Sequence, residues 1–156
     1  KIIQQGEIVS FDTDMVGPYG YCADISRTFV CGNFFNDNQK NLYSMAVNQI
    51  NHNSSLIKDG TTFKEFIEKS WKLPEEYYGN RYSVMVHGIG LCDEWPSIRY
   101  PTDGGDKGGI FQKNMTITVE SYIGKVGGKE GVKLEQQYLV GQNGLELMSH
   151  HPLEDI

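Results

Sequence analysis

Two neighbouring stretches near the start of the chain place acidic side chains among residues that otherwise suit buried strands. In residues 10–29, written SFDTDMVGPYGYCADISRTF, three aspartates stand within thirteen residues: Asp12, Asp14 and Asp24. Clustered carboxylates repel one another and lose hydration on burial, unless a cation neutralises them. The stretch therefore predicts either a turn wetted by solvent or a site for a positively charged group.

The residues around these aspartates predict two half-buried strands. Residues 7–14 and 19–30 have the composition of strands, and Gly17-Pro18 supplies the turn between them. Side chains two apart on a strand share a face, so the first two aspartates should point the same way, with the third opposite them. The apolar residues that predict burial are Ile8, Val9, Phe11, Ile25 and Phe29.

The composition is that of an ordinary globular chain, and it argues against several kinds of partner. The 156 residues suffice for one domain with a core, and 38% of them are hydrophobic. The net charge of -6 and the lack of a basic run argue against nucleic acid and against an anionic membrane surface. No apolar stretch approaches the roughly 20 residues that span a bilayer. Three cysteines without a CxxC pair favour reduced thiols and a cytoplasmic location.

The rest of the chain predicts an α+β fold. Residues 37–52 carry apolar side chains at helical spacing, and a second helix should begin at Thr62, with Glu65 completing a capping box. Residues 102–109 read as a glycine-rich loop without the context of a phosphate-binding loop. Four segments read as short strands between glycine turns: 82–90, 115–124, 132–141 and 145–149. We therefore expect one largely antiparallel sheet with two helices covering a face.

Two glutamates and a histidine on the later strands add to the three aspartates. Glu120 in TITVESYI and Glu135 in VKLEQQYLV stand among apolar strand residues, where an acid is costly unless it is paired or bound to metal. His87 in VMVHGIG precedes glycines that allow close approach of a ligand. Carboxylates with one imidazole suit iron, manganese or zinc, as one or two ions. Arg27 is expected to hold a ligand carboxylate, or else to anchor its strand.

The order Asp, Asp, His, Glu, Glu resembles that of the pita-bread metallopeptidase family, which includes methionine aminopeptidase, aminopeptidase P, prolidase and creatinase. The supporting segments are GYCADISRTF, HGIG, TVES and GVKLEQQYLV, and they extend from residue 6 to about residue 149. The resemblance implies a curved, mainly antiparallel sheet with helices packed on one face. It also implies that residues 1–156 are the C-terminal part of a pita-bread catalytic domain, without its first helices and N-terminal domain.

Three positions depart from the peptidases of this family. Those proteins usually carry a metal aspartate eleven residues before the second-strand aspartate, where this chain has Thr13. The proline-specific members carry further histidines around the metal histidine, where this chain has Ser83 and Glu94. The missing imidazoles would position a peptide bond and transfer protons, so these departures argue against peptidase activity.

The same departures resemble the dimethylsulfoniopropionate (DMSP) lyase branch of the family, through the segments FDTD, GYCADISRT and HGIGLCDEWP. The resemblance implies that Asp93, six residues after the metal histidine, is the catalytic base and that Tyr82 lies in the substrate site. Iron is the expected metal, although manganese and zinc would also suit the ligands, and a homodimer of the full-length protein is expected. The implied metal ligands are Asp12, Asp14, Asp24, His87, Glu120 and Glu135.

The implied reaction is a β-elimination that cleaves DMSP to dimethyl sulfide and acrylate after removal of the proton alpha to the carboxylate. A metal would stabilise the charge that develops as the proton leaves. Burial beside Trp95 and Glu94 would suit Asp93 to act as the base, and Trp95, Tyr82 or Tyr122 could hold the sulfonium by a cation–π contact. Two alternatives stay open: a dinuclear-metal Xaa-Pro aminopeptidase or prolidase, and a binding protein of this fold without catalysis.

Overall fold

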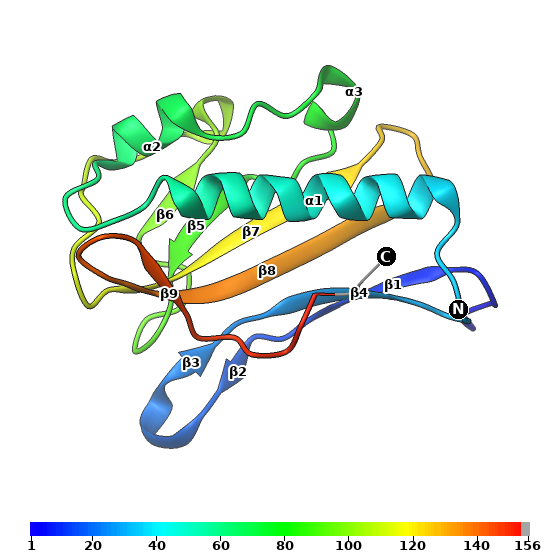
Figure 1. Ribbon diagram of the computed structural model, residues 1–156, viewed down its shortest axis with the longest axis horizontal. Coiled ribbons are helices and arrows are strands. Elements are labelled where there is room, and N and C mark those ends of the chain that lie inside the picture. The colour runs from blue at the N-terminus through cyan, green and yellow to red at the C-terminus, as the bar shows by residue number, and fades with distance from the viewer. Residues whose placement is uncertain (154–156) are drawn as a thin grey trace.

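The computed structural model describes residues 1–153, and its centre is a five-stranded sheet (Figure 1). The strands lie in the order β6-β5-β7-β8-β9, and each neighbouring pair is antiparallel. Their bounds are Val84–Gly88 (β5), Ser97–Arg99 (β6), Thr116–Gly124 (β7), Gly131–Val140 (β8) and Leu145–Leu147 (β9). The predicted antiparallel sheet is confirmed, and β6 is an addition to the predicted strands.

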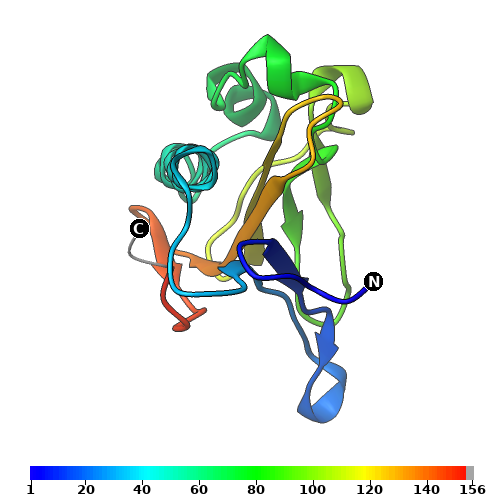
Figure 2. The ribbon, with the colours of Figure 1, turned by 90° about the vertical axis from the view of Figure 1, so that its right-hand side faces the viewer.

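The long helix α1 (Asp37–Ser55) packs against β7 and β8, and Figure 2 shows it on one side of the sheet. It begins after Asn36, whose side chain accepts a hydrogen bond from the Gln39 backbone, while the Gln39 side chain accepts one from the Asn36 backbone. This reciprocal pair satisfies two N–H groups that a helix start leaves unpaired. The helix expected over residues 37–52 is therefore confirmed and extends slightly further.

Two shorter helices follow. In α2 (Phe63–Lys69) the Thr62 hydroxyl accepts a hydrogen bond from the backbone of Glu65, but the Glu65 carboxylate pairs with Lys69, so the predicted capping box is only half formed. The helix α3 (Glu75–Tyr78) was not predicted, because four residues are too few to show a helical period. Among the described residues, no helix is long and apolar enough to cross a membrane.

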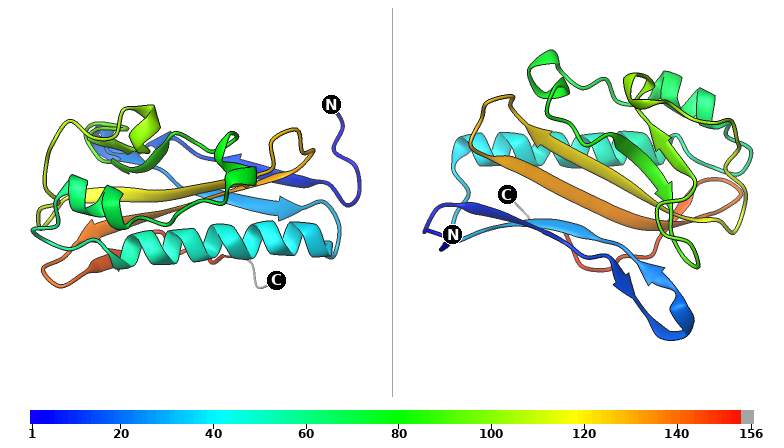
Figure 3. Two further views of the ribbon diagram at one scale, coloured as in Figure 1. Left: turned by 90° about the horizontal axis from the view of Figure 1, so that it is seen from above. Right: turned by 180° about the vertical axis from the view of Figure 1, so that it is seen from behind.

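The N-terminal segment forms two short ladders instead of two unbroken strands. The bounds are Ile8–Asp12 (β1), Met15–Val16 (β2), Cys22–Ala23 (β3) and Ser26–Val30 (β4), and β1 pairs with β4 and β2 with β3. Where the ladder is interrupted, the Thr13 hydroxyl donates a 2.9 Å hydrogen bond to the Ile25 carbonyl. The β2–β3 hairpin projects from the rest of the molecule (Figure 3). The expected burial is only partly found, because Phe11 is 60% exposed.

The strand β4 lies against β8 and so brings the N-terminal segment to the large sheet. The Thr28 hydroxyl donates a 2.8 Å hydrogen bond to the Lys133 carbonyl and accepts one from the Lys133 backbone at 3.1 Å. The loop between β3 and β4 is thereby held beside the middle of β8.

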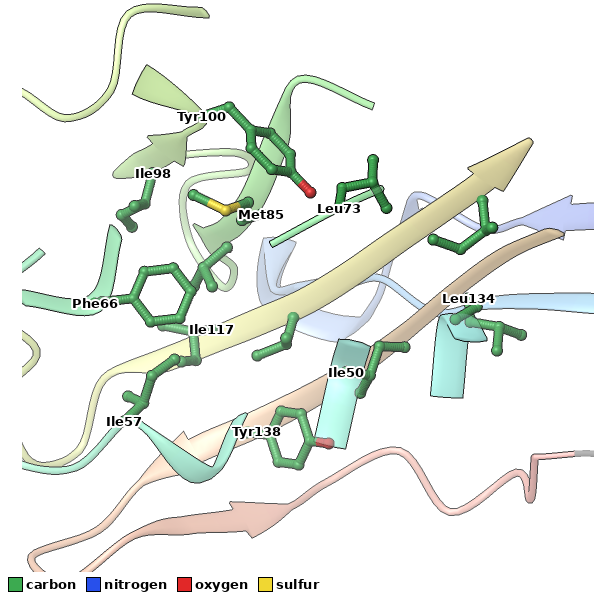
Figure 4. Close-up of a cluster of buried hydrophobic side chains, with 14 of the residues drawn as sticks. Ile50, Ile57, Phe66, Leu73, Met85, Ile98, Tyr100, Ile117, Leu134 and Tyr138 are labelled. Atoms are coloured by element: carbon green, nitrogen blue, oxygen red, sulfur yellow. The ribbon is translucent and has the colours of Figure 1, made fainter. Parts of the chain in front are cut away.

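The hydrophobic core fills the space between the helices and one face of the large sheet (Figure 4). Seven of its labelled members are at most 1% exposed: Ile50, Ile57, Phe66, Met85, Ile98, Ile117 and Leu134. Full burial of one such side chain contributes about 1.5–3 kcal/mol. Because side chains alternate along a strand, the residues between these apolar positions face the opposite side of the sheet.

Candidate metal centre

The sheet face opposite the core gathers charged side chains from three neighbouring strands. His87 on β5 lies directly across from Thr118 on β7, and Glu120 on β7 lies directly across from Glu135 on β8. Opposed residues in an antiparallel pair share a face, and so do residues two apart on one strand. The register therefore places the imidazole and both glutamates on the same face.

Asp24, from the loop between β3 and β4, completes a buried group of four. The Nε2 atom of His87 lies 3.6 Å from Asp24 Oδ2, 3.7 Å from Glu120 Oε1 and 3.3 Å from Glu135 Oε1. Each of the four side chains is at most 4% exposed. The backbone of Asp24 is held by a 3.3 Å hydrogen bond to the side chain of Gln137. The structure thus brings together four of the six predicted ligands from four separate segments.

These side chains have the features of a metal site. One ligand atom from each of Asp24, His87 and Glu135 lies within 4.8 Å of the others. Three buried oxygens of the group have no hydrogen-bond partner among residues 1–153, namely Asp24 Oδ1, Glu120 Oε1 and Glu135 Oε1. Burying such oxygens without a partner is costly, and a divalent cation would satisfy all three. Carboxylates and one imidazole suit iron, manganese or zinc, so the residues fit the expected group.

The proximity of the acids changes their pKa values. Burial and the neighbouring charge of Glu135 raise the pKa of Asp24 to about 9, and burial raises the pKa of Glu120 to about 7 although Lys133 opposes the change. Burial also acts on Glu135, but the close contact with His87 and the charge of Lys133 hold the pKa of Glu135 well below its usual range. Burial disfavours charged His87, yet the close contact with Glu135, the Gly88 carbonyl and the charge of Glu120 together outweigh it, and the pKa of His87 rises to about 9. The metal-free group therefore retains protons that a bound cation would displace.

The other two predicted ligands lie at the exposed edge of this group and reach different parts of it. The Asp12 side chain is 50% exposed, with Oδ1 accepting a hydrogen bond from Ser26 and Oδ2 lying 3.6 Å from the Lys133 ammonium. Asp14 is exposed, and its charge helps to raise the pKa of Asp24. Asp14 lies in the interruption between β1 and β2, so the two aspartates do not stand on one continuous strand as expected. Their role as ligands stays a prediction.

Lys133 is a member of the site that was not predicted from the sequence. It is 8% exposed, its ammonium is paired with Glu120 Oε2, and it lies 4.3 Å from the centroid of the Tyr82 ring. One face of Tyr82 is therefore already beside a cation. The alternation of side chains along GVKLEQQYLV could have identified Lys133, because a residue two positions before Glu135 on a strand shares its face.

The loop between β5 and β6 carries the predicted base, and most of its side chains are exposed, whereas the four central side chains of the metal group are buried. Asp93 and Glu94 are exposed and Trp95 is 57% exposed, so the expected burial of Asp93 is wrong. Trp95 lines a cavity of about 400 Å³, with the Lys107 ammonium 5.6 Å from its ring centroid. None of the predicted metal ligands lines this cavity. Tyr82, by contrast, lies beside the buried group and is 39% exposed.

The loop is nevertheless attached closely to the strand that carries His87. The Gly88 backbone donates a 2.8 Å hydrogen bond to the Pro96 carbonyl, and a Cβ atom at Gly88 would lie 2.1 Å from the Trp95 carbonyl oxygen. Only glycine allows this approach. The Gly90 carbonyl accepts a 2.7 Å hydrogen bond from Cys22, so the loop also lies beside the β2–β3 hairpin.

Arg27 anchors its strand and does not hold a ligand carboxylate. Its guanidinium donates to the carbonyls of Ser26, Glu135, His151 and Pro152 and to the side-chain oxygen of Gln136. The expectation that it holds a ligand carboxylate is therefore wrong, because its partners are neutral oxygens. It ties β4 to β8 and to the C-terminal segment.

Comparison with known sequences decides the family. The profile of metallopeptidase family M24 matches residues 1–142. The chain belongs to metallopeptidase family M24. Over 99% of its length it is 38% identical to the M24 relative called dimethylsulfoniopropionate lyase DddP from Roseovarius nubinhibens, and 35% identical to the protein of that name from Roseobacter denitrificans. It spans 35% of the length of each.

Solved structures of peptidases share the fold. The X-Pro aminopeptidase from Thermotoga maritima matches with a TM-score of 0.76 and 27% identity, over 97% of this chain and 41% of that one. The prolidase from Pyrococcus horikoshii matches with a TM-score of 0.79 and 26% identity, over 100% of this chain and 44% of that one. The α+β pita-bread fold predicted from the sequence is therefore confirmed for this M24 chain.

Proposed function

We propose that this chain is the metal-binding part of a DMSP lyase, which converts DMSP to dimethyl sulfide and acrylate. The observation that carries the proposal is its 38% identity, over 99% of its length, to a protein named as such a lyase. The relatives are about three times as long, so the proposal extends to the longer protein in which this segment acts. We propose further that residues 1–156 form the later part of its pita-bread domain.

In this proposal, Asp24, His87, Glu120 and Glu135 hold a divalent metal, which we expect to be iron, and Asp12 and Asp14 complete the ligand set. When bound, the metal would supply a Lewis acid beside the substrate carboxylate. Buried carboxylate oxygens without partners, described above, support this assignment.

Asp93 acts as the general base in the proposed reaction. Its carboxylate takes the proton from the carbon alpha to the substrate carboxylate. The electrons of that C–H bond form the double bond of acrylate, and the electrons of the C–S bond leave with dimethyl sulfide. A positioned base of this kind contributes a rate factor of about 10²–10⁴. Tyr82, at the edge of the buried group, is proposed to contact the substrate.

The scarcity of imidazoles near the centre supports a lyase over a peptidase. Within residues 1–153, His87 is the one histidine with a ring nitrogen within 4.0 Å of a carboxylate. His52 is hydrogen-bonded to the Lys69 carbonyl, away from the centre. Elimination from DMSP needs one base and no second imidazole to protonate an amine leaving group.

An Xaa-Pro peptidase is the second candidate, because the fold match to the Pyrococcus horikoshii prolidase extends over all of this chain. Ser83 and Glu94, at the positions where such peptidases would place histidines, argue against it.

Headspace gas chromatography separates the two candidates. The purified protein is loaded with Fe²⁺ or Mn²⁺ and given DMSP, and a parallel sample is given a Gly-Pro dipeptide and an Xaa-Pro peptide. Dimethyl sulfide without peptide cleavage supports the lyase. Peptide cleavage without dimethyl sulfide would overturn it.

A further inference from the structure

Lys133 occupies an unusual position, because it is a buried cation inside a group of residues suited to binding a cation. Its side chain is 10% exposed, and its ammonium contacts Glu120 Oε2 and lies 3.6 Å from Asp12 Oδ2. An ammonium so placed repels any metal ion nearby. A residue that lowers the attraction of the site for metal by its charge needs another reason for its position.

The hydrogen-bond pattern supplies that reason. The ammonium of Lys133 engages Oε2 of Glu120. The other oxygen, Oε1, lies 3.7 Å from His87 Nε2 and has no hydrogen-bond partner in the described part of the chain. Lys133 also contacts Asp12, where Ser26 donates to Oδ1 and the ammonium lies beside Oδ2, so both oxygens of this exposed carboxylate are engaged. Lys133 therefore fixes which oxygen of Glu120 is presented to the centre.

A second shared contact links Asp12 to Glu135. The Ser26 hydroxyl lies 2.9 Å from Glu135 Oε2, which leaves Glu135 Oε1 directed at His87, 3.3 Å away. Both glutamates thus turn one oxygen toward the imidazole and have the other engaged by the protein. The Tyr82 ring, 4.3 Å from the ammonium, limits the space in which the Lys133 side chain can move.

We propose that Lys133 is a positioning residue for the metal centre, orienting Glu120 and Asp12 so that the site is formed before the metal binds. This inference rests on the metal centre of the proposed function and adds to it a residue that is not a ligand. Outer partners that orient ligands typically change metal affinity by about 10–100-fold when they are removed.

Removal of Lys133 should change the metal affinity in one direction if the residue orients Glu120, and in the opposite direction if it acts only through its charge. If Lys133 acted only through its charge, its removal would make the site more negative and tighten the binding of a cation. If it acts by orienting Glu120, its removal frees that carboxylate and weakens binding. Metal affinity therefore separates the two roles without reference to catalysis.

The test is calorimetric titration of chelator-stripped protein with Mn²⁺, in the wild type and in Lys133→Met, Lys133→Gln and Lys133→Arg. We expect Lys133→Met to weaken binding by about 10–100-fold. Lys133→Gln retains a donor for Glu120 and should lose less, and Lys133→Arg should retain most of the affinity. Lys125→Met is the matched control, because Lys125 is an exposed lysine that pairs with Glu76 at the far end of β7.

Each result bears on a different claim. Unchanged or tighter Mn²⁺ binding in Lys133→Met and Lys133→Gln would overturn the inference while leaving the metal centre intact. Absence of binding by the wild type would contradict the metal centre itself, and the inference with it. If circular dichroism shows that Lys133→Met does not fold, the Gln variant decides, since the two roles predict opposite changes for it.

Discussion

The buried metal centre and the loop between β5 and β6 lie next to each other, yet they are built in different ways. The four central side chains are at most 4% exposed and are set by strand register, whereas Trp95 in the loop is 57% exposed and the neighbouring Asp93 is exposed too. Strands fix the positions of ligands closely, while loops tolerate change and often carry catalytic groups. Under the proposed function, metal binding and proton transfer are therefore separable roles of adjacent regions.

Removing the imidazole should have the largest effect, because it lies at the middle of the centre. His87→Ala should weaken Mn²⁺ binding by more than the roughly 100-fold that loss of an outer partner can cause, and abolish release of dimethyl sulfide. The measurement is Mn²⁺ titration of stripped protein. His52→Ala, on α1, is the control and should bind as the wild type does. Full affinity in His87→Ala would remove the distinction between the two regions.

A change at the junction of the two regions should affect the loop more than the centre. In Gly88→Ala the new Cβ would lie 2.1 Å from the Trp95 carbonyl oxygen, so the loop must move. A displacement of about 1 Å can lower a rate by about 100-fold. We expect kcat to fall by about that factor, with a smaller change in Mn²⁺ affinity. Equal losses of both would show that the loop and the centre are one unit.

Near neutral pH, the stability of the metal-free protein should depend on pH through the buried groups of the centre. The pKa of His87 rises from 6.5 to about 9, and that of Asp24 rises from 3.8 to about 9. Between pH 6.5 and about 9 the folded protein therefore binds protons that the unfolded chain has released, so the free energy of unfolding falls as pH rises. The melting temperature of stripped protein should decrease over this window, and Mn²⁺ should reduce the decrease. A flat profile without metal would contradict these assignments.

The smallest effect on stability is expected in the loop. Trp95→Ala removes a mostly exposed side chain and should change the free energy of unfolding by less than about 0.5 kcal/mol. Phe111→Ala, in which a ring 1% exposed is removed beside Phe63 and Phe66, should cost about 3–5 kcal/mol. Urea unfolding of both variants measures the contrast. A large loss in Trp95→Ala would mean that the loop supports the fold.

The helices and strands that show a regular spacing of apolar residues could be predicted from the sequence. The helix from residue 37 and the strands around His87, Glu120 and Glu135 could be predicted, because alternation and helical spacing follow directly from burial. The interruption at Thr13 could not, because it depends on a side-chain hydrogen bond to a residue twelve positions away.

The remaining misses concern long-range contacts of charged groups. Arg27 donates to the Glu135 carbonyl on β8, and Lys133 on β8 pairs with Glu120 on the neighbouring strand β7, so these partners are not visible in local sequence. The exposure of Asp93 could not be predicted either, because it depends on the conformation of the whole loop between β5 and β6.

The most direct test of the account is the rate of dimethyl sulfide release by Asp93→Asn, measured by headspace gas chromatography together with bound metal per chain. We expect release to fall by about 10²–10⁴-fold while the metal content stays at the wild-type value. Release at the wild-type rate, or loss of metal in this variant, would contradict the assignment of proton transfer to the loop and of metal binding to the sheet.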